Sequence, residues 1–228
     1  MIRTAILVDG AFYRKRAMYF WEDKTPQDRA EELSRYCWKH IRDEEDVFLY
    51  RIFYYDCPPI AKKVFHPLLG KVVDLSKSDT FTWTNDFLKE LKHQRKFALR
   101  LGKLAEEQAA YELDPHTVKR LLRKEITIAD LSEADFKLKV SQKGVDMRIG
   151  IDISSLAYKH QVDRIVLISG DSDFVPAAKQ ARREGIDFIL DPMRSKIKED
   201  LFEHIDGLRT KAPKEKRLGT VTASLDSY

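Results

Sequence analysis

The chain has little cysteine and no long apolar run, and these absences exclude a disulfide-rich protein and an integral membrane protein. It contains 228 residues but only two cysteines, Cys37 and Cys57, which are too few for a disulfide framework and lack the spacing of metal ligands. No apolar stretch approaches the roughly 20 residues of a membrane-spanning helix. The N-terminal apolar run meets Asp9 too early to serve as a signal peptide. We therefore expect a folded cytoplasmic protein without a membrane span.

Several nucleotide- and phosphate-handling motifs are also missing. The chain has no Gly-x-x-x-x-Gly-Lys-Ser/Thr, and no Gly-x-Gly-x-x-Gly follows an apolar run, which excludes a P-loop NTPase and a dinucleotide-binding Rossmann domain. A haloacid-dehalogenase-like phosphatase needs a second Asp two residues after the first, where this chain has Ala11. No repeat with a period of 20 to 50 residues is visible, which argues against a solenoid.

The composition is that of a globular protein with a mildly basic surface. Hydrophobic residues make up 43% and charged residues 34%, and 41 Lys and Arg face 37 Asp and Glu, a formal net charge of +4. The cations are spread along the chain, whereas several acids fall at the ends of apolar runs. An acidic pocket within a basic surface is suited to a polyanionic substrate that is bound with the help of metal ions.

Six short apolar runs predict the strands of an α/β fold with a mainly parallel sheet. They cover residues 4–8, 47–55, 97–104, 136–140, 164–168 and 186–190, and helical patterns cover 85–96, 115–124 and 173–184. We expect one domain over 1–208, with a helical insertion at about 75–133 that shapes substrate access or a dimer interface. The charged segment 209–228 is expected to be a flexible tail.

Carboxylates follow the predicted strands at the points where these end. Asp9 closes the first run, Asp171 and Asp173 follow the run 164–168, and Asp146 opens a helix after Gly144. Ligands bind outside the carboxyl ends of strands in open α/β sheets, so the four acids are expected to converge there. For Asp9, Asp171 or Asp173 taken alone, a helix cap or a turn is an equally good interpretation.

Four carboxylates at one edge repel each other unless a cation compensates them. Oxygen ligands without a nearby Cys or His favour Mg²⁺ or Mn²⁺ over zinc, and such a site activates water and neutralises charge on a phosphate. Asp152 lies six residues after Asp146, about 120° away around a helix. It is therefore a second-tier candidate, with an ion pair to Lys or Arg as its alternative role.

At these residues the chain resembles the NYN domain, in the LabA-like branch of the PIN-like metal-dependent ribonucleases. The matching pieces are Val8-Asp9-Gly10-Ala11-Phe12, Phe53-Tyr54-Tyr55-Asp56, Lys143-Gly144-Val145-Asp146 and Ser169-Gly170-Asp171-Ser172-Asp173-Phe174. The resemblance implies a three-layer α/β/α PIN-like, Rossmann-like fold. It also implies an Mg²⁺ or Mn²⁺ site built by Asp9, Asp146, Asp171 and Asp173, and hydrolysis of RNA phosphodiester bonds.

Further residues are candidates for supporting roles. Ser169, Ser172 and Lys143 are second-tier site residues with Asp152, although turn, cap and solvated-surface roles explain them as well. Single-stranded RNA is bound by aromatic faces and cations. The candidates for RNA contact are Arg14, Arg16, Tyr55, Lys143, Arg148, Lys179 and Arg182.

The main alternative is a non-catalytic module that binds RNA or a protein partner on the same PIN-like scaffold, since fold and function can separate. In that case the acids serve a metal-dependent structure. The sequence does not tell which RNA is the substrate, whether cleavage is internal or from an end, or whether a homodimer forms.

Overall fold

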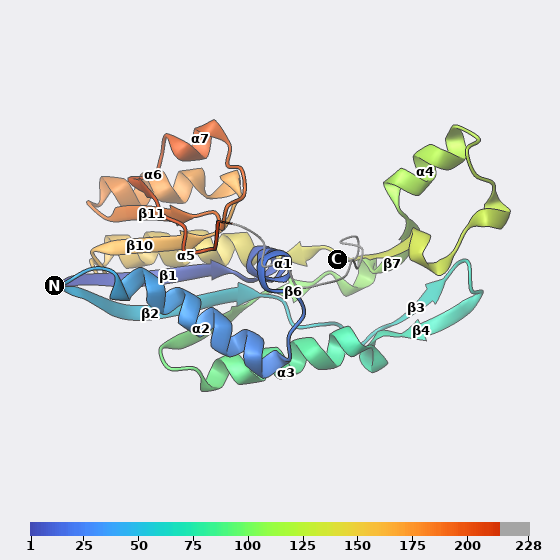
Figure 1. Cartoon of the computed structure of the whole chain (residues 1–228), viewed down its shortest axis with the longest axis horizontal. Coiled ribbons are helices and arrows are strands. Elements are labelled where there is room, and N and C mark those ends of the chain that lie inside the picture. The colour runs from blue at the N-terminus through green and yellow to red at the C-terminus, as the bar shows by residue number, and fades with distance from the viewer. Residues whose placement is uncertain (215–228) are drawn as a thin grey trace.

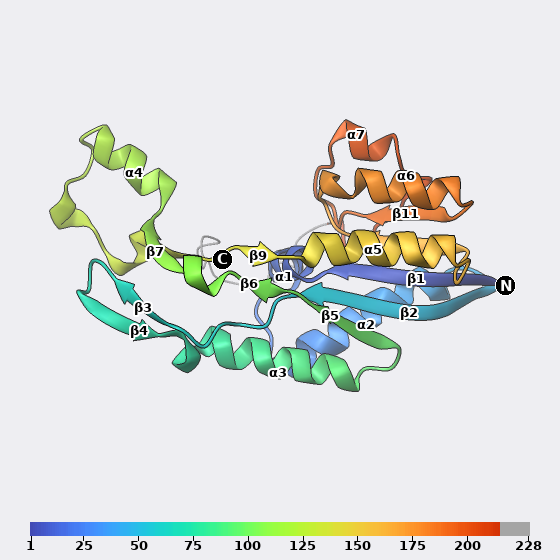
Figure 2. The same cartoon turned by 180° about the vertical axis from the view of Figure 1, so that it is seen from behind.

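The computed structural model describes residues 1–214, which form a three-layer α/β/α body and a projecting arm (Figures 1 and 2). The central sheet has six strands in the order β12-β11-β10-β1-β2-β5, and every neighbouring pair is parallel. The strands are β1 (Ile2–Asp9), β2 (Val47–Asp56), β5 (Phe97–Leu101), β10 (Arg164–Ile168), β11 (Asp187–Asp191) and β12 (Gly207–Leu208). The predicted fold class is confirmed.

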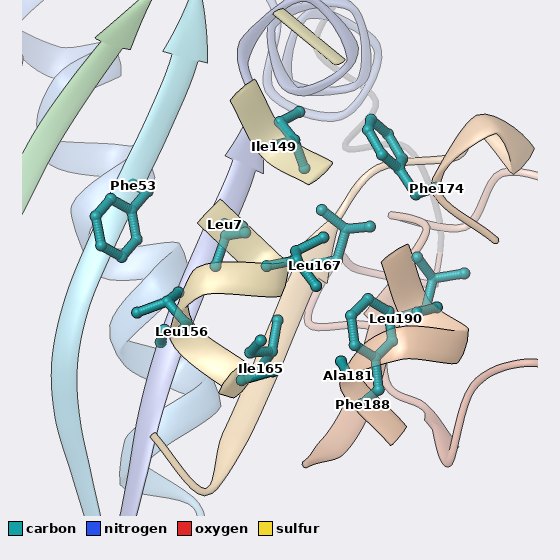
Figure 3. Close-up of a cluster of buried hydrophobic side chains, with 14 of the residues drawn as sticks. Leu7, Phe53, Ile149, Leu156, Ile165, Leu167, Phe174, Ala181, Phe188 and Leu190 are labelled. Atoms are coloured by element: carbon teal, nitrogen blue, oxygen red, sulfur yellow. The ribbon is translucent and has the colours of Figure 1, made fainter. Parts of the chain in front are cut away.

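Both faces of the sheet are covered by helices, which explains why its central strands read as continuous apolar runs. Ile6 and Val8 lie in the core beneath α1 (Gly10–Trp21), α2 (Pro26–Arg42) and α3 (Asp79–His93). Ala5 and Leu7 belong to the opposite core, against α5 (Val145–Tyr158), α6 (Val175–Arg183) and α7 (Glu199–Phe202). Figure 3 shows this second core between the strands and α5 and α6.

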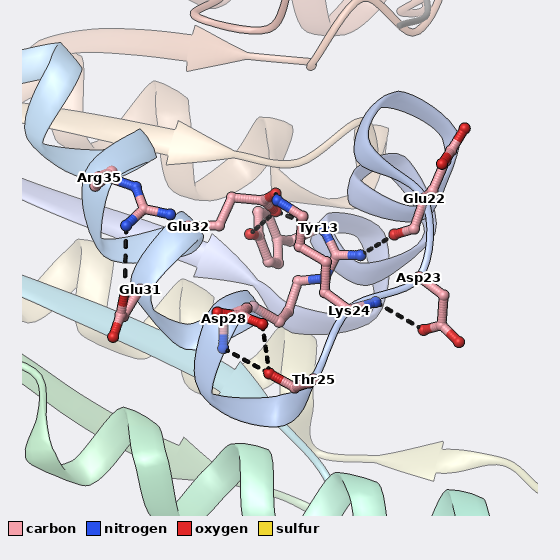
Figure 4. A network of polar contacts seen from close by, with 10 residues as sticks. Tyr13, Glu22, Asp23, Lys24, Thr25, Asp28, Glu31, Glu32 and Arg35 are labelled. Atoms are coloured by element: carbon pink, nitrogen blue, oxygen red, sulfur yellow. Dashed lines mark hydrogen bonds and ion pairs between the residues drawn. The ribbon is translucent and has the colours of Figure 1, made fainter. Parts of the chain in front are cut away.

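A buried carboxylate joins the first two helices. Glu32 of α2 accepts hydrogen bonds from the Tyr13 hydroxyl of α1 at 3.0 Å, from Arg29 at 2.5 Å and from the Lys24 ammonium at 2.6 Å (Figure 4). A buried charge is tolerated only when such partners compensate it. Thr25 caps α2 by accepting from the Asp28 N–H at 3.1 Å. These contacts fix α1 against α2 directly after the end of β1.

The arm comprises residues 57–78 and 103–143 and leaves the body on the side to which β1 and β2 point (Figures 1 and 2). It has a small core of its own around Ile60, Val64, Leu75 and Ala109. Its strands pair as three antiparallel hairpins or ladders, β3 with β4, β6 with β9 and β7 with β8. They are β3 (Lys63–His66), β4 (Lys71–Asp74), β6 (Lys103–Leu104), β7 (Ala110–Leu113), β8 (Phe136–Lys139) and β9 (Gln142–Lys143), with α4 (Pro115–Leu122).

Two strand predictions need correction. The run 97–104 is broken at Gly102 into β5 of the sheet and β6 of the arm. The run 136–140 is not in the central sheet, because β8 pairs with β7 in the arm. Its alternation of apolar and basic residues fits any strand with one wet face, so periodicity alone does not identify its partner. The short β12 has no apolar run and was not predicted.

The expected bounds of the insertion and the tail also differ from the structure. The range 75–133 includes α3 and β5, which lie in the body, so the arm instead arises from two separate segments. In the expected tail, Arg209 pairs with Glu44, the Lys211 ammonium lies 2.6 Å from Asp43, and Ala212 is buried. Residues 209–214 are therefore docked on the body. The remainder of the expected tail, 215–228, lies outside the described residues.

Candidate functional site

Asp9 ends β1 at the carboxyl edge, the edge of the sheet where β1, β2, β10 and β11 terminate. Its Oδ1 accepts from the Phe12 N–H at 3.1 Å and so caps α1, while its Oδ2 accepts from the Ser169 hydroxyl at 3.1 Å. Burial raises the pKa of Asp9 to about 6, because the two hydrogen bonds do not offset the lost hydration and the charges of Asp146 and Asp56 add to it. This carboxylate is held in place but poorly neutralised.

Asp146 lies in the first turn of α5, two residues after a glycine that the backbone requires. Gly144 has φ of 77°, in the left-handed region, and the Arg148 guanidinium folds back to donate to its carbonyl at 2.7 Å. The pKa of Asp146 is raised, first by partial burial and then by the charges of Asp171 and Asp173. Helix α5 thus places the Asp146 carboxylate close enough to the loop after β10 to interact electrostatically with Asp171 and Asp173.

Ser169 links the loop after β10 to β1. It is fully buried, and its hydroxyl oxygen, which donates to Asp9, accepts from the Asp171 N–H at 3.2 Å. Asp171 in turn accepts from the Asp173 N–H at 3.0 Å and caps the short 3₁₀ turn Ser172–Phe174. Asp171 therefore has the cap role that was one of its two interpretations, and it remains exposed beside Asp173.

The four aspartates have no ion-pair partner in the part of the chain that the structure describes. Within residues 1–214, no Lys, Arg or His forms an ion pair with Asp9, Asp146, Asp171 or Asp173. In the same residues, no group of three or more acidic, His or Cys side chains is close enough together to hold a metal ion. The structure thus brings the acids to one edge as an open, negatively charged set rather than a closed cage.

Asp56, at the end of β2, is a neighbouring acid that sequence reasoning did not include in the site. It is fully buried and accepts hydrogen bonds from Arg14, from the Tyr54 hydroxyl at 2.7 Å and from the Cys57 N–H at 2.8 Å. Its charge contributes to the raised pKa of Asp9. An acid at the end of an apolar run, followed after Cys57 by two prolines, was the signal that could have identified it.

Lys198 is the second residue that sequence reasoning missed. Its ammonium donates to the Ser172 hydroxyl at 3.0 Å, which places a cation beside the residue that separates Asp171 from Asp173 in the chain. The segment 192–198 after β11 carries it, and Ser195 of that segment lies near Gly170. No sequence motif marks this lysine, because the contact depends on how the segment folds back over the edge.

The family model for the NYN domain matches residues 82–204, more than half of the chain. The chain belongs to the NYN domain family. This family is part of the PIN-like nuclease superfamily, so the resemblance stated from the motifs is confirmed at the level of the family. The match begins after Asp9 and Asp56 and contains Asp146, Asp171 and Asp173.

Other comparisons add little to this NYN domain. No curated protein matches the chain. A crystal structure of a protein of unknown function from Vibrio parahaemolyticus is similar over 92% of this chain and 93% of that one, with 17% identity and a TM-score of 0.45. No helix within residues 1–214 has the length and apolar character needed to cross a membrane.

Several of the predicted RNA contacts have internal partners in the NYN domain. Arg14 binds buried Asp56, and Arg16 donates to the Met193 carbonyl at 2.8 Å. Tyr55 is fully buried with its hydroxyl 2.8 Å from Asp152, so its ring has no exposed face for a base. Sequence patterns do not reveal these hydrogen bonds and ion pairs, because each partner comes from a distant segment.

The other predicted positions divide into paired and exposed ones. Asp152 also accepts from Arg100 at 2.9 Å, which is the ion pair named as its alternative role. Arg182 donates to Asp206 at 2.8 Å near the end of α6. Lys143 and Lys179 are exposed, and a role in RNA contact stays a prediction for both.

Proposed function

We propose that this NYN domain is a metal-dependent ribonuclease that hydrolyses RNA phosphodiester bonds at Asp9, Asp146, Asp171 and Asp173. The observation that carries the proposal is the uncompensated charge at the carboxyl edge. The pKa values of Asp9 and Asp146 are raised there, and no cation of the described chain pairs with either. Membership of the PIN-like nuclease superfamily supports the reaction type.

The donor set fits Mg²⁺ or Mn²⁺ by its chemistry. All four side chains offer carboxylate oxygens, the ligands that hard divalent cations prefer. Mg²⁺ keeps several waters and is commonly held by one or two carboxylates together with substrate phosphates, so an open set suits it better than a closed cage would. When bound, the ion supplies an activated water and neutralises charge on the phosphate.

The chain's own residues fix the geometry around that site. Ser169 holds the Asp9 carboxylate and the Asp171 backbone at once, which ties β1 to the loop after β10. Asp171 and Asp173 are exposed and so accessible to a polyanion. Lys198, next to Ser172, offers a cation to the substrate phosphate. We take the substrate to be single-stranded RNA in the cytoplasm; a homodimer or a protein partner would be an addition to this scheme.

The test is cleavage of a labelled, mixed-sequence single-stranded RNA by the purified chain with Mg²⁺, Mn²⁺ or EDTA. Asp171→Asn keeps the cap, because Asn and Asp cap equally well, and it is expected to abolish the products. Asp163→Asn, which removes an acid paired with Arg3 in the loop before β10, is the matched control and should cleave normally at a temperature well below its Tm. RNA binding without any metal-dependent product would instead support a non-catalytic binding module.

A further inference from the structure

Two lysines lie directly opposite each other where the arm joins the body. Lys103 of β6 and Lys143 of β9 are partners in a two-residue antiparallel ladder, and both are exposed. Residues opposite each other in such a ladder project to the same side, with Cβ atoms about 5 Å apart. Lys143 precedes Asp146 by three residues, and β9 leads from the arm into α5 (Figure 2), so the pair lies on the arm side of the acidic edge.

The backbone around this pair is closely packed. The Gly102 N–H donates to the Asp56 carbonyl at 2.7 Å, which ties β6 to the end of β2. A Cβ at Gly102 would lie 2.8 Å from the Lys143 carbonyl oxygen, closer than such contacts occur, so the two chain segments meet only because this residue is glycine. The Ala105 N–H also donates to the Ser141 carbonyl at 2.8 Å. The two lysines are thus presented from a fixed ladder.

The free chain gains nothing from this arrangement of charges. Like charges directly opposite each other in a ladder are unfavourable, and the structure gives neither ammonium a carboxylate partner within residues 1–214. An opposite charge at either position would be better for folding. Two adjacent ammonium groups become favourable when a phosphate with its negative charge lies between them.

We propose that Lys103 and Lys143 form a clamp for backbone phosphates of single-stranded RNA, which guides the strand from the arm to the four aspartates. This rests on the proposed function and names where the substrate is held outside the acidic site. The clamp binds phosphate and carries no base specificity, since phosphate contacts position a nucleic acid without reading its sequence. Its loss weakens binding of RNA and leaves the bond-breaking site intact.

The experiment measures RNA affinity separately from cleavage. A fluorescent single-stranded RNA is titrated with the Asp171→Asn protein over a series of KCl concentrations. Three further variants are made in this background: Lys103→Ala, Lys103→Glu and the double variant with both Lys103→Ala and Lys143→Ala. Each lysine that binds a phosphate contributes about 0.7 to the slope of log affinity against log salt. Lys89→Glu, an exposed site on α3, is the control with the same change of charge as Lys103→Glu.

The expected result is a slope reduced by about 0.7 in Lys103→Ala and about 1.4 in the double variant. Lys103→Glu should lose at least as much affinity as Lys103→Ala, with a Tm no lower than that of its parent, because it pairs with Lys143 instead of repelling it. In the cleaving protein, Lys103→Ala should raise KM and leave kcat unchanged.

Unchanged slopes in the variants, with normal cleavage by the wild-type chain, would overturn the clamp and leave the proposed function standing. An equal loss in Lys89→Glu would show a general charge effect and would overturn it too. A fall in Tm that accompanies the loss of affinity would assign the loss to local unfolding and contradict the clamp. A wild-type chain that neither binds nor cleaves RNA would refute both the clamp and the proposed function.

Discussion

Replacing Asp9 by Asn should make the metal-free protein more stable at neutral pH. Asn keeps the cap of α1, since Asn and Asp serve equally well at that position, and it removes a charge that is expensive to bury. The pKa of Asp9 is raised from 3.8 to about 6 in the folded chain. The ionised carboxylate is therefore less stable in the folded state than in the unfolded state, and the folded state bears that cost.

The size and pH dependence of the effect follow from this shift. A difference of about 2.2 pKa units corresponds to about 3 kcal/mol of unfolding free energy at 1.36 kcal/mol per unit. Below pH 3.8 the carboxyl is protonated in both states and Asp9→Asn should change little; the gain grows between pH 3.8 and 6 and is complete above 6. For a chain of this length, about 3 kcal/mol raises Tm by roughly 6 to 12 °C.

The assay is thermal unfolding of both proteins in EDTA from pH 4 to pH 8. Asp163→Asn is the control with the opposite sign, because hydrogen bonds from Arg3 lower the pKa of Asp163 to about 2. The contribution of Asp163 is present above its unfolded pKa and is lost as the pH falls toward 2, so its replacement should destabilise the chain at neutral pH. A Tm for Asp9→Asn that equals or falls below the wild-type value at pH 8 would refute the reasoning.

Metal binding, close packing and a buried hydrogen bond are each open to a direct test. Mg²⁺ at 100 times its dissociation constant should stabilise the wild-type chain by about 2.7 kcal/mol, and Asp9→Asn should lose most of this gain; equal stabilisation of both proteins would contradict the role of Asp9. Gly10→Ala should destabilise by roughly 1 to 3 kcal/mol in urea unfolding, because a Cβ would lie 2.6 Å from the Tyr54 ring and hydroxyl; an unchanged midpoint would refute the close packing. Tyr36→Phe removes the hydroxyl that donates to buried Asp191 at 2.5 Å, and a loss of about 1.5 to 3 kcal/mol is expected in the same assay.

The positions of the strands in the body could be predicted because local and global signals agree there. β1, β2, β10 and β11 are buried on both faces, so each is a short apolar run with an acid or a turn at its end. Parallel strands terminate at one edge, which predicts that Asp9 and Asp171 lie at the same edge, and the pairing of β1 with β10 makes them neighbours there. The hydrogen bonds of Ser169 to both residues confirm their proximity.

The arm could not be predicted, because its strands are short and its pairing is non-local. β4 ends at Asp74 and β7 begins only at Ala110, yet β3 and β4 share one small core with β7 and β8. The basic and apolar alternation of residues 136–139 indicates a strand with one wet face and carries no information about its partner. The two-residue strands β6, β9 and β12 are too short to give any periodic signal.

The roles of single charged residues were the least predictable part of the site. Arg14 has the local sequence of a solvated basic helix face, but its guanidinium forms an ion pair with buried Asp56. Lys198 lies in a charged loop without any motif and nevertheless reaches Ser172. Both contacts depend on how separate segments come together at the carboxyl edge, which composition and spacing do not encode.

Hydrolysis of RNA at the four aspartates requires water as the nucleophile. The most direct measurement is mass spectrometry of the products of single-stranded RNA incubated with the chain and Mg²⁺ in heavy-oxygen water. The expected result is one heavy oxygen in the terminal phosphate of the product, with no product in EDTA or from Asp171→Asn. Cyclic phosphate ends without heavy oxygen, or the same products from Asp171→Asn, would contradict the claim.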